Sequence, residues 1–431
     1  MAKYRVPVFI IIVISILSAT WILIQIGNGY RPNIKNGSIQ VTNTGLLVAN
    51  SQPEGAQVLI NQELNTATND TISLSPGEYD VEIKKDGFIP WKKKISIESS
   101  IVIQTNAFLF PIVPDLKAIT YTGAINPELA PNGTRIVYAV NEENPSTSSS
   151  KLTDTKTGIW LLELTDLPLG FSRDPKQIVS GPIQDDWQNC KFIWSYDSRQ
   201  IITLCQSSIA KVNTLSQKTP SPSAKINTIA YLIDINQQQK SSNLTNITNS
   251  YSAILDEWQI EQTLKTKQQL INLKSDLNSL ISTVASEINF SPDETKILYI
   301  ATASATLKDN YIDPILAASS QSQTRILQPN KLYLYDTKED RNFLIDATPA
   351  TTSAQRNTKY QWFPTSRHLI KSTPNQISII EYDNTNEAVI YSGNITSLDV
   401  FPHPSDNKLI IATTLNPVQA PIPNLYTLIF R

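Results

Sequence analysis

Histidine, the side chain most often used for proton transfer near neutral pH, occurs only twice in this chain. His368 and His403 each lie beside a predicted turn between strands, where a solvated or hydrogen-bonded imidazole is far more common than a catalytic base. The sequence lacks the serine-elbow, His-Glu-x-x-His and phosphate-loop motifs. We therefore expect no catalytic site built on histidine and no bound cofactor.

Paired carboxylates are the second group with the right chemistry for catalysis. Glu142/Glu143 and Asp185/Asp186 are adjacent acids, and glycoside hydrolysis uses two carboxyl groups, one of them as a proton donor. All four lie in predicted polar loops, where carboxylates are ordinarily solvated. We assign no catalytic residue from these pairs.

The two cysteines have a spacing that would place them opposite each other across a β-hairpin. The predicted turn is centred between Asp197 and Ser198, and reflecting Cys190 about this centre reaches Cys205. Directly opposed residues lie about 4.5–5.5 Å apart, within disulfide range at the short end. A disulfide and two buried free thiols are equally weighted alternatives. Two cysteines and two distant histidines do not have the spacing of a zinc site, so we expect no metal.

The elements that must position these residues repeat along the chain. Each copy has an apolar or aromatic lead-in, a turn rich in Pro, Asp, Asn, Ser or Gly, a basic residue and then residues that favour strands. A repeat of this kind decides the whole architecture. The copies lie at 129–138, 193–202, 290–299, 362–370 and 401–410.

A second strand is predicted after each copy, and four of these are followed by a shorter apolar run. The unit is therefore a four-stranded antiparallel meander used about five times. The last copy lacks its own final strand, so we expect 116–121 to supply it and close a ring. The pattern resembles β-propellers of the TolB-like, WD40-like kind over 115–431. That resemblance implies protein partners.

Residues 37–111 are predicted to form a smaller β unit, because apolar and polar residues alternate in its strands. We expect Lys92–Lys94 to form a solvated face of this unit. The unit resembles the PEGA domain, which implies a small extracytoplasmic β-sandwich without catalytic activity. The resemblance rests on Pro-Glu-Gly-Ala at 53–56, Pro-Gly-x-Tyr-x-Val at 76–81 and Gly-Phe-x-x-Trp at 87–91.

The N-terminus indicates a membrane anchor. Residues 6–26 are apolar and uncharged, and about 20 such residues span a bilayer as a helix. Lys3 and Arg5 in the stub 1–5 place that side in the cytoplasm. A cleaved signal peptide is the alternative. Residues 27–36 are predicted to be a polar linker.

Residues 250–286 interrupt the β pattern with a predicted helical insertion that contains neither Pro nor Gly. Its apolar residues recur at helical spacing, and Trp258 extends the stripe less regularly. The stripe packs on the side of the propeller or, alternatively, binds a partner helix. Its members are Leu270, Leu273, Leu277, Leu280 and Val284.

The formal net charge of −2 gives no signal for nucleic-acid binding. We expect an all-β, non-enzymatic binding or scaffold protein of the bacterial cell envelope. It would be single-pass in the cell membrane, with its bulk extracytoplasmic, and would recognise envelope or surface proteins through the propeller face and its insertions. The alternative is a hydrolase, a lyase or a lectin-like binder acting on cell-wall glycan or peptide. Cell-wall polymer is a second class of partner, and the oligomeric state stays open.

Overall fold

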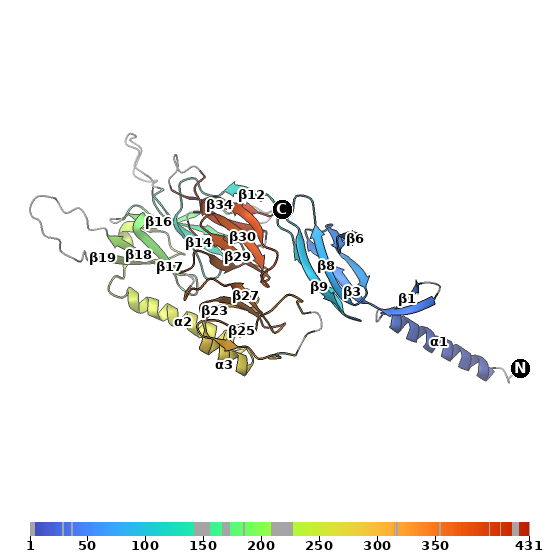
Figure 1. The fold of residues 1–431 in the computed structure, drawn as a ribbon. Helices are drawn as coiled ribbons and strands as arrows, with labels where there is room; N and C mark the ends of the chain where they lie inside the picture. The colour runs from blue at the N-terminus through green and yellow to red at the C-terminus, as the bar shows by residue number, and fades with distance from the viewer. Residues whose placement is uncertain are drawn as a thin grey trace, which may run out of the picture.

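The protein is seen in a computed structural model as an elongated chain, with an N-terminal helix, a small β domain and a larger β body in succession (Figure 1). Glu142, Glu143 and Asp185 lie outside the described residues. The structure describes residues 5–27, 30–35, 38–141, 156–165, 173–183, 186–207, 227–313, 315, 318–352, 355–395, 397–405, 407–415 and 422–430.

Helix α1 (Arg5–Gly27) contains the segment predicted at 6–26. Within the part of the chain that the structure describes, no helix has both the length and the apolar character that crossing a membrane requires. The predicted linker 27–36 needs correction, because strand β1 (Tyr30–Lys35) occupies most of it and pairs with β2 (Ser38–Asn43). The β1–β2 register runs from Tyr30 opposite Asn43 to Lys35 opposite Ser38.

The small domain consists of short sheets around one apolar core, as its alternating pattern predicted. Val81 and Ile83 are buried, whereas the intervening Glu82 is not. The core also contains Leu47, Val58 and Trp91. The sheets have the orders β10-β3-β7 (Val102–Gln104, Gly45–Ala49, Asp70–Leu74), β11-β4 (Ala107–Phe108, Ser51–Gln52) and β6-β5-β8-β9 (Glu63–Ala67, Gln57–Ile60, Gly77–Lys84, Trp91–Ile97).

Within its described residues, the body contains five main sheets, four of them antiparallel with four strands and one with a fifth strand added in parallel, a pattern consistent with propeller blades. Sheet one is β13-β14-β15-β16 (Ile125–Leu129, Arg135–Val140, Gly158–Glu163, Lys176–Ser180), extended by β20 (Gln239–Lys240). Sheet two is β17-β18-β19-β21 (Cys190–Trp194, Gln200–Ser207, Asn227–Asp234, Thr245–Asn246). Sheet three is β22-β23-β26-β27 (Ala285–Phe290, Lys296–Ala301, Leu332–Asp336, Arg341–Asp346).

Sheet four is β28-β29-β30-β31 (Lys359–Trp362, His368–Thr373, Gln376–Glu381, Ala388–Ser392). Sheet five is β32-β33-β34 (Val400–Pro402, Lys408–Thr413, Asn424–Ile429), completed by β12 (Asp115–Ala118) from the start of the body. Asp115 pairs with Ile429 and Ala118 with Tyr426, so the closing strand predicted at 116–121 is confirmed. It begins one residue earlier and ends three residues earlier than predicted. A small hairpin, β24-β25 (Ala305–Thr306, Ile326–Leu327), and the 3-10 helices η3 (Trp187–Asn189) and η4 (Ser241–Asn243) complete the body.

The five sequence repeats form equivalent turns. In each copy, one backbone N–H after the first strand donates to the carbonyl five residues later, at the start of the second strand. Gly133, Ser198, Glu294 and Ser366 take the same place in their turns with a positive φ of 57–70°. The bonds join Ala130 to Arg135, Ser195 to Gln200, Ser291 to Lys296, Phe363 to His368 and His403 to Lys408, at 2.8–3.3 Å.

Neighbouring sheets pack face to face through shared apolar clusters. Such clusters join sheet one to two, three to four, four to five and five to one. Between sheets two and three lie helices α2 (Tyr251–Ile271) and α3 (Ser275–Val284). α2 packs through Trp258 on Ile202 of sheet two, and α3 packs through Ile281 on Ile297 of sheet three.

Two tryptophan side chains join neighbouring sheets at equivalent positions. Trp194 Nε1 donates to the Glu128 carbonyl at 3.2 Å, bridging sheets two and one. Trp362 Nε1 donates to the Asn289 carbonyl at 3.1 Å, bridging sheets four and three. Both rings are buried, and each bond ties the indole of one sheet to the backbone of its neighbour.

Replacing Trp194 or Trp362 by Phe keeps an aromatic ring but removes the hydrogen bond to the neighbouring sheet. We expect each variant to lose about 0.5–1.5 kcal/mol of the free energy of unfolding, measured by urea denaturation. Trp160→Phe is the control, because Trp160 donates to the Lys156 carbonyl in an exposed position. An equal loss of stability in the control would show that the smaller ring, not the missing hydrogen bond between sheets, causes the effect.

The small domain and the body share a buried ionic contact, which corrects the solvated face predicted at 92–94 for Lys93 alone, because Lys92 and Lys94 are exposed. The Lys93 ammonium lies between Glu381 and Asp383 of the body, and Trp91 donates to Glu381. Burial lowers the pKa of Lys93, but the two carboxylates outweigh it and raise the pKa above its ordinary value. The lysine therefore stays charged and fixes the small domain on sheet four.

His368 lies at the same junction, packed edge-on against Phe108 and Phe110 with its Nδ1 2.9 Å from the Thr365 hydroxyl. Burial, and then the charges of Arg367 and Lys93, lower its pKa to about 3. His368 is therefore neutral in the folded protein at physiological pH.

The depressed pKa of His368 predicts acid sensitivity. Between pH 6.5 and about 3, the unfolded chain binds a proton that the folded protein excludes. This stabilisation is complete above pH 6.5, and about 1.4 kcal/mol is lost for each pH unit below it. A His368→Gln variant should show a flatter pH profile of the unfolding free energy; parallel profiles would contradict the prediction.

Candidate functional site

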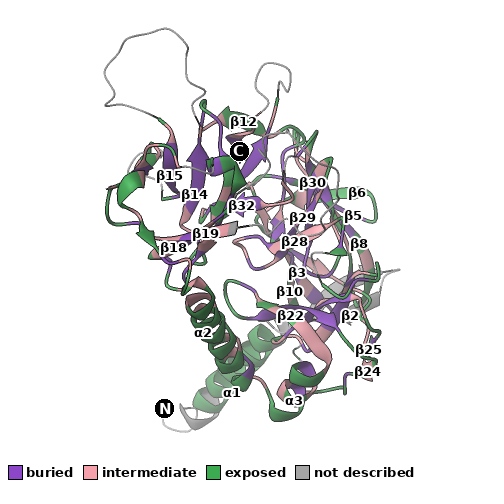
Figure 2. Cartoon of the chain, turned by 90° about the vertical axis from the view of Figure 1, so that its left-hand side faces the viewer, coloured by how far each residue is buried: buried purple, intermediate pink, exposed green. Residues whose placement is uncertain are grey.

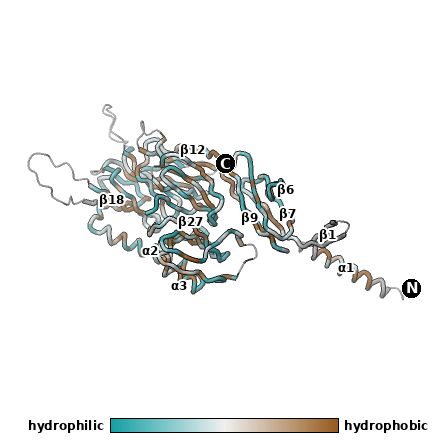
Figure 3. The backbone as a smooth tube through the Cα atoms, viewed as in Figure 1, coloured by the Kyte–Doolittle hydropathy of each residue, from teal (hydrophilic) through white to brown (hydrophobic). Residues whose placement is uncertain are grey.

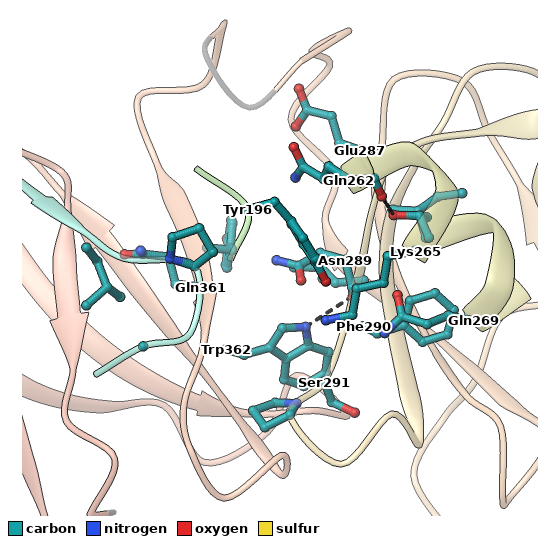
Figure 4. A pocket seen from close by; sticks show the side chains of 18 of the residues that line it. Tyr196, Gln262, Lys265, Gln269, Glu287, Asn289, Phe290, Ser291, Gln361 and Trp362 are labelled. Atoms are coloured by element: carbon teal, nitrogen blue, oxygen red, sulfur yellow. Dashed lines mark hydrogen bonds between the residues drawn. The ribbon is translucent and has the colours of Figure 1, made fainter. Parts of the chain in front are cut away.

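A cavity of about 1170 Å³ lies where α2 takes the place of a direct contact between sheets two and three. Its walls come from the inner strands and turns of several sheets and from one face of α2. Figure 4 shows Tyr196, Gln262 and Lys265 on its rim, with Asn289 and Trp362 further in.

The inner strands hold the cavity residues in place. The β22–β23 pairing shifts register between Ser286 and Asn289, and Glu287 within this bulge has a φ of 49°. Bulges re-aim side chains next to functional sites, and here Glu287 and Asn289 both reach the cavity. The wall on the other side is held by Trp258, which packs on sheet two.

Aromatic and amide side chains are prominent in the lining, beside aliphatic residues and four charged ones. Their aromatic faces offer apolar contact, while each amide both donates and accepts hydrogen bonds. This chemistry suits an uncharged ligand with its own donors and acceptors. The aromatic residues are Trp194, Tyr196, Trp258, Phe290, Tyr360 and Trp362, and the amide residues are Asn132, Gln259, Gln262, Gln269, Asn289 and Gln361.

Several charges at the cavity are already engaged. The Lys265 ammonium lies 5.5 Å from the centre of the Tyr196 ring, a cation–π contact. Gln269 donates to Glu294 at 2.8 Å. Arg356 is buried and lies 3.5 Å from Asp346, measured from Nε to the carboxylate.

Glu128, on inner strand β13, is a titratable group outside this lining. Its side chain reaches solvent on one side, but the surrounding protein desolvates the carboxyl and raises its pKa to about 7. The negative charge of Asp399 adds to the rise, and the Lys359 ammonium opposes it. Lys359 and Asp399 form an ion pair with each other.

The structure distributes the predicted stripe between two helices. The predicted single helix over 250–286 is interrupted after Ile271, and its last two residues belong to β22. Leu270 and Leu277 are buried, and the other members pack partly buried against the same cluster in sheet three. The stripe is therefore core: its expected packing on the side of the β body is confirmed, and the alternative that Leu270, Leu273, Leu277, Leu280 and Val284 bind a partner helix is contradicted. Of the six residues predicted to form a partner-binding helix, Trp258 alone lies in the cavity wall.

Sequence reasoning missed the amide residues of the wall. Gln262 and Gln269 lie on a polar face of α2, and nothing in the sequence distinguishes them from glutamines exposed to solvent. Gln361 lies on a strand and reaches the cavity only because sheet four faces sheet three. Among the described residues, no group of three His, Cys, Asp or Glu side chains could hold a metal ion.

The cysteines lie opposite each other in the β17–β18 hairpin, and a disulfide joins them. Both are fully buried in the cluster between sheets one and two, away from the cavity. The disulfide is therefore a structural crosslink of sheet two.

Comparison with known proteins identifies the small domain. No curated protein matches the chain. Among solved structures, it is similar to a putative TolB from Agrobacterium tumefaciens (12% identity, 70% of each chain, TM-score 0.18). It is also similar to Pyrococcus horikoshii acylaminoacyl peptidase (10%, 90% of this chain and 51% of that one, TM-score 0.23). A third similar structure is Kuenenia stuttgartiensis hydrazine synthase (9% identity, 92% of this chain and 99% of that one covered, TM-score 0.19). Residues 44–111 are a PEGA domain.

Proposed function

We propose that this is a non-enzymatic, membrane-anchored binding or scaffold protein of the cell envelope that holds a segment of a partner protein in the cavity beside α2. The observation that carries the proposal is the cavity itself. At about 1170 Å³, it is larger than the 300–1,000 Å³ usual for small-molecule sites. A polymer segment fits this size better than a metabolite does.

The lining favours a polypeptide as the ligand. A peptide backbone presents one donor and one acceptor at each residue, and the cavity amides can satisfy both. The rings of Trp194, Trp258 and Trp362 offer apolar faces to side chains between those groups. The bound segment would be enclosed by propeller-like sheets and by an insertion, as expected from the sequence.

Two observations support an envelope location. The side chains described in α1, from Phe9 to Ile24, are exposed, with Phe9 68% and Leu23 67% exposed. Figure 3 colours part of this helix as hydrophobic. Exposed apolar side chains are suited to lipid, so we propose that α1 acts as a single-pass membrane anchor. The Cys190–Cys205 disulfide fits an oxidising, extracytoplasmic compartment for the body.

Narrowing the cavity should weaken binding of the partner segment. In Gln262→Trp, the indole would occupy part of the cavity, and we expect affinity for peptides selected from a displayed library to fall at least about tenfold. Fluorescence anisotropy on the full chain in nanodiscs measures this. Gln268→Trp is the matched control, because Gln268 lies on α2 outside the lining.

The same assay distinguishes protein from polysaccharide. The peptide proposal would be replaced by a lectin-like function under one outcome. In that outcome, solubilised cell-wall glycan binds the wild type but not Gln262→Trp, and no peptide binds.

A hydrolase of cell-wall glycan is a second candidate, favoured by Glu128 alone. A carboxyl group with a pKa of about 7 is about half protonated at pH 7, and its protonated form can act as a general acid, with Asp399 as the second carboxylate.

Such an activity would depend on the protonated form of Glu128. Glycan cleavage should therefore decline as the pH rises above about 7. Glu128→Gln should reduce it by at least about 100-fold. Glu63→Gln, in the exposed strand β6, is the control. Equal rates in the two variants, or no release of sugars by the wild type, would exclude this function.

A further inference from the structure

The cavity beside α2 extends along strand β23, and its two ends are formed by different residues. At one end is the turn after Phe290, where Gln269 of α2 donates to Glu294. The lining continues along β23 through Leu298 and Ile300. Figure 2 looks onto α2, which is largely exposed, and onto the inner strands β22 and β28 that line the cavity with it. A bound segment would therefore lie along β23, from the turn toward the end of the strand.

Arg356 lines the cavity near the end of β23 that lies away from the turn. Its Nη2 atom donates to the Asn330 carbonyl at 3.3 Å. The Asn330 N–H in turn donates at 2.7 Å to the carbonyl of Ala301, the last residue of β23. The guanidinium is therefore held beside the strand end, and only 2% of the arginine side chain is exposed.

The Arg356 guanidinium has more donors than partners. Arginine carries five N–H groups, and among the described residues Nε and Nη1 of Arg356 have no hydrogen-bond partner. Asp346 is 3.5 Å from Nε, too far for a strong hydrogen bond, and its other carboxylate oxygen accepts the Thr348 N–H at 2.7 Å. Buried donors without partners are destabilising, especially on a charged group, so we looked for the missing acceptor in a ligand.

We propose that Arg356 binds a carboxylate of the partner segment, either the one at the end of its chain or that of an aspartate or glutamate side chain. The planar guanidinium can donate two parallel hydrogen bonds to a carboxylate. The aromatic and amide lining suits the uncharged part of the segment, and Arg356 is the exception at one end of the cavity. This inference rests on the proposed function, because it specifies the chemistry of the same ligand.

Binding requires the arginine to move. Nε and Nη1 are themselves covered, so the guanidinium must turn about its side-chain bonds toward the cavity that it lines. A carboxylate gains more from this turn than a backbone carbonyl does, because hydrogen bonds between two charged groups are the stronger ones. The negative charge of Asp346 opposes the ligand carboxylate, so it should weaken the binding of a charged ligand and not that of a neutral one.

Peptides synthesised in charged and neutral forms test the carboxylate directly. Peptides are selected from a library that presents free C-termini. Each one is then prepared with a C-terminal amide or with its Asp and Glu residues replaced by Asn and Gln. In fluorescence anisotropy on the full chain in nanodiscs, one of these two changes should weaken binding at least about tenfold. The change that does so identifies the source of the carboxylate as the chain end or a side chain.

Two variants should act in opposite directions. Arg356→Gln should lower the affinity for the charged peptide to that for its neutral form, whose own affinity stays unchanged. Asp346→Asn should raise the affinity for the charged peptide at least about threefold, because a repelling charge is removed. A misfolded variant could not bind more tightly. Arg341→Gln is the matched control, since Arg341 lies on β27 outside the lining and the change should alter neither affinity.

The outcomes separate this inference from the proposed function. Peptides that bind the wild type equally well in charged and neutral forms would overturn the role of Arg356 and leave peptide binding intact. If no peptide binds, the proposed function fails, and calorimetric titration with N-acetyltryptophan and its amide decides about Arg356 alone. The acid should bind the wild type at least about tenfold more tightly than the amide and lose that preference in Arg356→Gln. Absence of this difference would overturn the inference too.

Discussion

The burial of both faces of each sheet is the constraint on which this structure depends. A β-sheet with apolar residues on both faces must be covered on each side. Four of the five junctions meet this requirement by direct contact between neighbouring sheets. At the fifth, between sheets two and three, α2 and α3 supply the covering surface, and the cavity forms where that cover is incomplete. The candidate site therefore arises at the one junction where helices, rather than a neighbouring sheet, cover the sheet faces.

The polar character of α2 follows from its place at this junction. A helix that only covered a sheet would have a broad apolar stripe, but α2 meets sheet two over a narrow strip that includes Leu255 and Trp258. The amides along its next face border the cavity, where water or a ligand can satisfy them. α3 is different, because Leu277 and Ile281 are enclosed by sheet three. The insertion therefore combines a firmly packed helix with one that is held along a single edge.

The features that could be predicted from sequence are those determined locally. The five turns were recognisable because Pro, Asp, Asn and Gly restrict the backbone at fixed positions, and the hairpin register then placed Cys190 opposite Cys205. The closing strand followed from the need to complete the last sheet. In the PEGA domain, alternation identified Val81 and Ile83 as core.

The features that could not be predicted depend on which surfaces meet. The leucine spacing continues through Asn272–Lys274 although the helix does not, because α3 turns to pack on sheet three. Lys93 belongs to a lysine run that has the composition of a solvated face, and only the approach of Glu381 and Asp383 buries it. The cavity amides carry no pattern of their own, because their role arises from the position of α2 beside the inner strands.

The pairing of β12 with β34 has a consequence for the order of folding. These strands are far apart in the sequence, so the sheet that they share cannot form until β34 is available. Contacts between residues so distant in sequence are slow to form, because a long loop must be closed. Sheets one to four can form during synthesis, but sheet five must wait for the last strand. Until then β33 presents an unpaired edge on the side that β34 will occupy, which makes the late-synthesis chain the form most exposed to aggregation.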